Sequence, residues 1–184
     1  VLGLGHLAQA VLGYLEDRRP ESIEVVTVVE PEPLGTAGAV RFLAKEIESD
    51  PVLVMNGDSL VGADLCAFVR SHAASGAEAS LLCTEMDDTA RYGRVDVAPD
   101  GRIRGYREKK TAHPAPGIVN AGVYLFGAAM MARIRAASGA SLERDIFPAA
   151  PPGCLHAMTG RFPFVDIGTP ESLNAASEVV TACL

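Results

Sequence analysis

Short, nearly continuous apolar runs recur along this chain, and this pattern limits the possible folds more than any other feature. Buried strands are predicted at Ile23 to Val29, Val52 to Met55, Ala79 to Thr84, Ile118 to Phe126 and Phe162 to Ile167. Helical spacing is found from His6 to Glu16, Thr36 to Glu48, Asp64 to Ala74 and Ala128 to Ala137. Strands that alternate with helices predict an α/β fold, with a mostly parallel sheet and helices on both faces.

The middle of the chain departs from this alternation. Between residues 95 and 106, apolar residues alternate with polar ones on both sides of Pro99-Asp100-Gly101, which is a turn signal. This pattern predicts a β-hairpin inserted into the α/β fold. The sequence has no internal repeat and no linker, and its length fits one domain. We therefore expect residues 1–184 to form a single domain.

Composition excludes several classes of protein. The chain has 184 residues and a net charge of −7, and its basic residues are not clustered, so a general nucleic-acid surface is not expected. No apolar run reaches the roughly 20 residues that a membrane helix needs. The four cysteines form no CxxC pair, which argues against a zinc or redox motif and fits free thiols in a reducing cytoplasm. The four histidines have no spacing typical of metal ligands.

Two acidic residues follow buried strands directly. Asp58 comes after Val52 to Met55 in the turn Asn56-Gly57-Asp58, and Asp166 precedes Gly168 at the end of the last strand. Open α/β sheets bind ligands at the carboxyl ends of their strands, and two carboxylates there can hold Mg²⁺. Taken alone, Asn56-Gly57-Asp58 fits a structural turn equally well. The pair predicts a magnesium site at Asp58 and Asp166.

Three further segments have polar residues that could bind a ligand. The glycines of Pro33-Leu34-Gly35-Thr36-Ala37-Gly38 could let a base or ribose lie against the backbone, or could form only a tight turn. Glu108 and Lys109 could bind sugar hydroxyls and a phosphate, although on composition alone a solvated charge run is the better explanation. Asn120, in an otherwise apolar strand, needs a hydrogen-bond partner, either backbone or a sugar hydroxyl.

Together these segments resemble the family of sugar-1-phosphate nucleotidyltransferases. The matching pieces are Glu30 to Ala39, Val54 to Asp58, Arg91-Tyr92-Gly93, Tyr106 to Lys109, Asn120 to Tyr124 and Phe164 to Pro170. Arg91-Tyr92-Gly93, the short connection from Lys109 to Gly117 and the segment Ser141 to Pro148 resemble the D-glycero-D-manno-heptose 1-phosphate guanylyltransferases in particular. Lys110 departs from the family pattern, because many members have Pro after the Glu-Lys pair.

The resemblance implies a Rossmann-like nucleotidyltransferase fold and a mechanism. A sugar-phosphate oxygen attacks the α-phosphorus of a nucleoside triphosphate, expected to be GTP, and pyrophosphate leaves. The product would be a nucleotide sugar for surface polysaccharide synthesis. The catalytic and metal residues would be Asp58 and Asp166 with Mg²⁺. The nucleotide residues would be Glu30, Leu34, Gly35, Thr36, Asn56 and Gly57, and the sugar-phosphate residues Gly93, Glu108, Lys109 and Asn120. The resemblance also allows a homo-oligomer.

Glu30 is the residue expected to select the base. A carboxylate can accept both Watson–Crick donors of guanine in parallel, whereas uracil and thymine offer one. An exposed glutamate at the end of a strand is the alternative explanation of this residue.

The family's opening glycine-rich triphosphate loop is absent from this sequence. We therefore expect residues 1–184 alone to be inactive, with an exposed edge at the Val52 to Met55 strand. A non-catalytic module that binds nucleotide sugars stays an alternative, as does a relative that uses UTP, dTTP or GTP with glucose- or mannose-1-phosphate. A glycosyltransferase is disfavoured, because the chain has no Asp-x-Asp motif.

Overall fold

A computed structural model describes residues 1–107 and 115–183. Contacts divide them into two compact units. Unit 1 comprises residues 1–49 and 131–149, and unit 2 comprises residues 50–130 and 150–184. The expectation of a single domain stays a prediction.

Unit 1 is a small α/β unit around one strand pair. Its elements are β1 (Leu2–Leu4), α1 (Ala8–Arg18), β2 (Thr27–Val29), α2 (Gly35–Leu43), the 3-10 turn η1 (Ala44–Glu46), the end of α4 (Ala128–Ala136) and the π-helical turn η2 (Leu142–Ile146). Strands β1 and β2 pair in parallel. The strand predicted from Ile23 is therefore shorter than expected, and it begins at Thr27.

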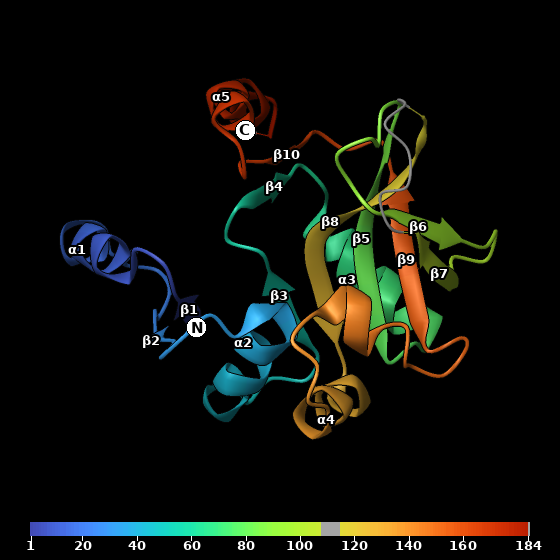
Figure 1. The fold of residues 1–184 in the computed structure, drawn as a ribbon, viewed down its shortest axis with the longest axis horizontal. Coiled ribbons are helices and arrows are strands. Elements are labelled where there is room, and N and C mark those ends of the chain that lie inside the picture. Colours follow the sequence, from blue (N-terminus) through green and yellow to red (C-terminus); the bar gives the residue numbers. More distant parts are fainter. Residues whose placement is uncertain (108–114, 184) are drawn as a thin grey trace. The chain divides into compact units, whose positions relative to one another are not determined.

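Unit 2 is built on a six-stranded sheet (Figure 1). Its elements are β3 (Val52–Met55), β4 (Ser59–Val61), α3 (Leu65–Ser75), β5 (Ala79–Met86), β6 (Arg94–Val97), β7 (Ile103–Arg107), β8 (Gly117–Phe126), β9 (Leu155–Gly160), β10 (Phe164–Asp166) and α5 (Pro170–Cys183), with the start of α4. The sheet has the order β7-β6-β8-β5-β9, and β3 also pairs with β8. Strands β4 and β10 form a separate antiparallel pair.

The prediction of an α/β fold is confirmed, but the prediction of a mostly parallel sheet is wrong for unit 2. Strand β8 runs antiparallel to both β3 and β5, and β5 and β9 form the one parallel pair in the described part of this sheet. The inserted hairpin contributes to this pattern. It is present as β6 and β7, and β6 also pairs antiparallel with β8, so antiparallel pairs dominate the described part of this sheet.

The long strands of this sheet are buried on both faces. On one face, Phe68 of α3 packs against Leu82 of β5 and Val123 and Leu125 of β8, all at most 2% exposed. The residues that alternate with them, such as Leu81, are also fully buried. This burial explains why the strands read as continuous apolar runs.

Strand β3 has one edge with no partner among the described residues of unit 2. Its register with β8 runs from Val52 opposite Phe126 to Met55 opposite Val123. Leu53 and Met55 are 42% and 50% exposed. The exposed edge expected for this strand is therefore confirmed.

None of the helices within the described ranges combines the length and the apolar character that a membrane span requires.

Candidate functional site

The two predicted catalytic carboxylates come from neighbouring positions of the β4–β10 pair. Ser59 lies opposite Asp166 in this pair, and the Ile167 amide donates to the carbonyl oxygen of Asp58 at 2.8 Å. Asp58 and Asp166 are therefore one residue apart across the two strands, although they are more than 100 positions apart in sequence. They belong to this short pair and not to the main sheet.

Both carboxylates retain an oxygen that no described residue binds. Oδ1 of Asp58 accepts from the Ser59 hydroxyl at 3.3 Å, and Oδ1 of Asp166 accepts from the Gly168 amide at 2.8 Å. Asp58 is exposed and Asp166 is half-buried. Among the described residues there is no cluster of three or more His, Cys, Asp or Glu that could hold a metal. Two carboxylates fit Mg²⁺, which commonly takes one or two protein carboxylates and completes its shell with water and substrate phosphates.

Asn56 and Asn120 lie where one edge of β8 changes its partner. The second half of β8 pairs with β3, and Val119 in the first half pairs with β6. Strand β5 occupies the other edge of β8. Strands β3 and β6 therefore lie one after the other along the same edge of β8. The register against β5 shifts between Leu82 and Cys83, which produces a bulge in β8 next to Asn120. Such bulges often occur beside active sites.

Hydrogen bonds hold the residues around this bulge in place. The Asn56 amide donates to the Gly122 carbonyl at 2.8 Å. The Asn120 side chain donates to the Tyr124 hydroxyl at 2.8 Å and accepts from the Gly122 amide at 3.1 Å. Of the two partners that the sequence left open for Asn120, the structure shows the backbone one, at Gly122, and binding of a sugar hydroxyl stays a prediction. Around Gly57, no described atom comes within 4 Å of the position that a Cβ would occupy, so the backbone there is open to a ligand.

Arg91 and Tyr92 lie beside Asp166, and sequence reasoning did not nominate them. The Tyr92 ring meets Phe164 edge-on at 5.7 Å between centroids, and Arg91 donates to the Thr169 hydroxyl at 3.4 Å. Burial raises the pKa of Tyr92, and the charge of Asp166 raises it further against the opposing effect of Arg91. The sequence did contain a signal for these two residues, because the segment Arg91-Tyr92-Gly93 matches the family pattern. Of this segment only Gly93 was nominated, and it is exposed at the start of β6.

The predicted nucleotide residues of unit 1 make their own local contacts. Glu30 is half-buried, and its Oε2 accepts from the Leu34 amide at 3.3 Å. Gly35 has φ +72°, and a Cβ there would lie 2.5 Å from the carbonyl oxygen of Ala140. The Thr36 hydroxyl accepts from the Leu142 amide at 2.9 Å. Gly35 is therefore required by the turn and by the approach to Ala140, as the structural interpretation of this loop expected.

Glu108 and Lys109 lie outside the described residues. Their assignment to the sugar phosphate stays a prediction.

Comparison with known proteins relates this arrangement to one family. The profile of the Nucleotidyl transferase family matches residues 6–182. The chain is 30% identical over 180 residues to a mannose-1-phosphate guanylyltransferase of Mycobacterium tuberculosis, covering 96% of this chain and 50% of that protein. It is 35% identical over 161 residues to the mannose-1-phosphate guanylyltransferase catalytic subunit beta of Xenopus tropicalis, covering 85% and 44%. The chain spans about half the length of these curated relatives.

The fold also resembles solved structures. The crystal structure of HddC from Yersinia pseudotuberculosis matches with a TM-score of 0.84 at 30% identity, covering 96% of this chain and 76% of that one. The structure of HddC complexed with GMP-PN matches with a TM-score of 0.82 at 29% identity, covering 95% and 75%.

Proposed function

Because the chain belongs to the Nucleotidyl transferase family, we propose that it acts in transfer of a guanylyl group from GTP to a sugar 1-phosphate, with release of pyrophosphate. One observation carries this proposal: the β4–β10 register brings Asp58 and Asp166 to neighbouring positions at strand ends. The nucleotide sugar formed would serve surface polysaccharide synthesis.

In this proposal the protein positions its substrates and compensates their negative charge. Asp58 and Asp166 would hold Mg²⁺, which when bound would neutralise phosphate charge. The open backbone at Gly57 lets a phosphate or ribose approach the strand end closely. No protein nucleophile is needed, because the sugar-phosphate oxygen attacks the α-phosphorus itself and pyrophosphate is the leaving group.

The guanine preference would come from Glu30. Its carboxylate is held near the start of α2 by the Leu34 amide, which limits the conformations of the side chain before a base binds. A carboxylate with restricted motion can accept the two parallel donors of guanine at a lower entropic cost. The GMP-PN complex of HddC and the guanylyltransferase names of the curated relatives support a guanine nucleotide.

The sugar would be recognised by Gly93, Glu108, Lys109 and Asn120. The sequence features of the heptose branch support a heptose 1-phosphate as acceptor. The curated relatives favour a second candidate, because both are mannose-1-phosphate guanylyltransferases. The two acceptors are distinguished by assay.

The test is pyrophosphate release by the intact protein with GTP, UTP or dTTP and with heptose-, mannose- or glucose-1-phosphate. We expect GTP with heptose 1-phosphate to give the highest kcat/KM. A preference for UTP or dTTP would overturn the guanine assignment. Loss of that preference in Glu30→Gln would support the role of Glu30, whereas an unchanged preference would remove it. No turnover with any pair would favour the non-catalytic alternative.

The metal assignment is tested by Asp58→Ala and Asp166→Ala in the same protein. Each should abolish turnover while circular dichroism shows an intact fold. Asp17→Ala, at an exposed position of α1, is the control and should keep full activity. Near-normal activity in both of the first two variants would exclude the carboxylate pair as the catalytic centre.

A further inference from the structure

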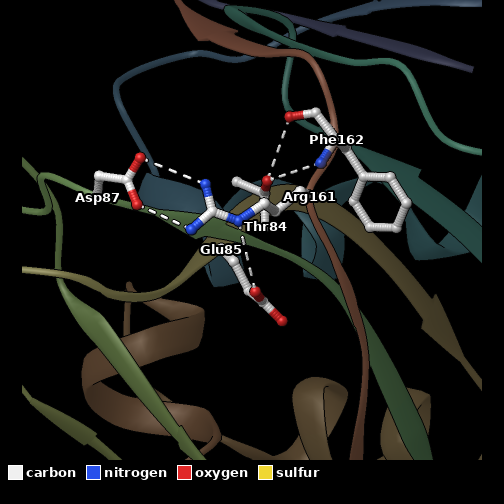
Figure 2. A network of polar contacts seen from close by, with 5 residues as sticks. All are labelled: Thr84, Glu85, Asp87, Arg161 and Phe162. Carbon is white, nitrogen blue, oxygen red and sulfur yellow. Dashed lines mark hydrogen bonds and ion pairs between the residues drawn. The ribbon is translucent and has the colours of Figure 1, made fainter.

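The segment that delivers Asp166 is anchored to β5 by one buried side chain. Residues Arg161 to Pro163 connect β9 to β10, and Asp166 ends β10. Thr84 of β5 is 1% exposed. Its hydroxyl donates to the Phe162 carbonyl at 3.3 Å and accepts from the Phe162 amide at 3.2 Å (Figure 2). A single hydroxyl therefore binds both polar groups of the Phe162 backbone.

Packing and pairing extend this anchor towards Asp166. The Phe162 ring packs on the core formed around Phe68 and Leu82. One residue later, the Pro163 carbonyl accepts from the Gly62 amide at 2.8 Å, which begins the pairing of β10 with β4. The position of β10, and so of its last residue, follows from where Phe162 is held.

Exposed ion pairs form a second, weaker attachment. Arg161 donates to both carboxylate oxygens of Asp87, at 2.8 and 3.3 Å, and lies 3.9 Å from Glu85 (Figure 2). All three side chains are at least 48% exposed, and ion pairs in water contribute little to holding a segment. The buried Thr84 hydroxyl is the stronger constraint, because its loss leaves partly buried peptide groups without partners.

We propose that Thr84 is a positioning residue for the Asp166 carboxylate. By fixing the Phe162 backbone, it sets the register in which β10 meets β4 and places Asp166 beside Asp58. This inference rests on the proposed function, because it takes the two carboxylates to be metal ligands. Thr84 lies on β5 and binds Phe162, which is four residues before Asp166. Thr84 therefore has no direct part in the chemistry.

The test replaces the hydroxyl without changing the shape of the side chain. Thr84→Val removes both hydrogen bonds, and Thr84→Ser keeps them. Ser80→Ala is the matched control, because Ser80 is an equally buried hydroxyl of the same strand that binds His72 at 2.8 Å and not Phe162. Mn²⁺ binding to the intact protein is followed by electron paramagnetic resonance. The Mg²⁺ concentration for half-maximal pyrophosphate release is measured beside it.

We expect Thr84→Val to weaken Mn²⁺ binding about fivefold and to raise the Mg²⁺ requirement by a similar factor. This is less than the roughly 10–100-fold loss typical when a group bonded to a metal ligand is removed. Thr84→Ser should stay near wild type. Ser80→Ala should lower the melting temperature without changing Mn²⁺ binding. If Thr84→Val does not fold, Thr84→Ala carries the same test.

Wild-type Mn²⁺ affinity in folded Thr84→Val would overturn the inference, and so would equal losses in Ser80→Ala, which would indicate general destabilisation. Wild-type affinity in Asp166→Asn would also overturn it, because the carboxylate would then hold no metal. Failure of the proposed function looks different. In that case wild type releases no pyrophosphate with any substrate pair, while the Mn²⁺ comparison between wild type and Thr84→Val can still be made.

Discussion

Replacing Gly122 with alanine tests how backbone strain and a clash at the candidate site each affect stability and activity. Its φ is +75°, and a Cβ there would lie 2.8 Å from Nδ2 and 3.1 Å from Cβ of Asn56. Gly153 is a natural control in the same unit, because its φ is +81° and no described atom comes within 4 Å of the added Cβ. The two alanine variants therefore share the conformational cost and differ in the contact.

The expected magnitudes follow from these two terms. The left-handed conformation costs an alanine about 1–2 kcal/mol, which corresponds to a fall in melting temperature of about 2–8 °C at roughly 2–4 °C per kcal/mol for a chain of this size. Gly122→Ala adds the displacement of Asn56 from its rotamer, which costs about 0.5–1.5 kcal/mol. Gly122→Ala should therefore melt below Gly153→Ala, by a further about 1–6 °C.

The assays are thermal unfolding followed by circular dichroism and pyrophosphate release. Because Asn56 directly precedes Gly57 and Asp58, Gly122→Ala should also lose most of its activity, whereas Gly153→Ala should keep it. In an Asn56→Gly background, the extra loss of stability in Gly122→Ala should disappear. Equal melting temperatures and equal activities for the two alanine variants would refute the reasoning.

Two further predictions concern titratable groups whose pKa is shifted by burial. Burial, followed by the positive charge of Arg102 and that of His72 when it is protonated, lowers the pKa of His156 from its usual 6.5, against the opposing effect of Asp100. The folded protein therefore favours the neutral ring, so this contribution to stability is complete above pH 6.5 and is lost as the pH falls below it. The melting temperature should fall more between pH 7.5 and 5.5 in wild type than in His156→Gln, and equal falls would contradict this. Burial raises the pKa of Cys83 to about 12, so iodoacetamide at pH 8 should modify exposed Cys66 and leave Cys83 intact until the protein unfolds. Labelling of both thiols at one rate in the folded protein would show that Cys83 is accessible.

Local patterns were enough to predict the elements that depend on neighbouring residues. The uninterrupted apolar run Val52 to Met55, which ends at the turn residues Asn56 and Gly57, predicted β3. Asp64 predicted the start of α3, and it accepts from the Ala67 amide at 2.9 Å. The turn at Gly101 predicted the hairpin, and Gly101 has φ +81°. In each case the determining contact lies within a few residues.

Features that depend on distant partners were not predicted. An apolar run indicates that β8 is buried but not its direction, which depends on how the chain enters the sheet. Strand β4 has three residues and a partner about 100 positions later, so no local signal marks it. Strand β9 contains His156 and Gly160 and lacks the apolar continuity of β5. Arg91 was overlooked because it contacts Thr169, 78 positions away.

The order in which the sheet of unit 2 can be completed has a consequence for biosynthesis. Ala79 of β5 pairs with Leu155 of β9, 76 positions later. At about 5–20 residues per second, a ribosome needs about 4–15 s to cover that distance, whereas a hairpin such as β6–β7 forms in microseconds. Throughout this interval the edge of β5 that later pairs with β9 has no hydrogen-bond partner from β9.

An apolar strand with an open edge is a template for pairing with other chains. The nascent polypeptide should therefore be most prone to aggregation while residues 87–155 are being synthesised. Slower initiation or a lower growth temperature should improve the yield of folded protein more than changes to the mature surface would. The carboxylate pair can form only after β10 has been synthesised, because Asp166 follows β9 in the chain.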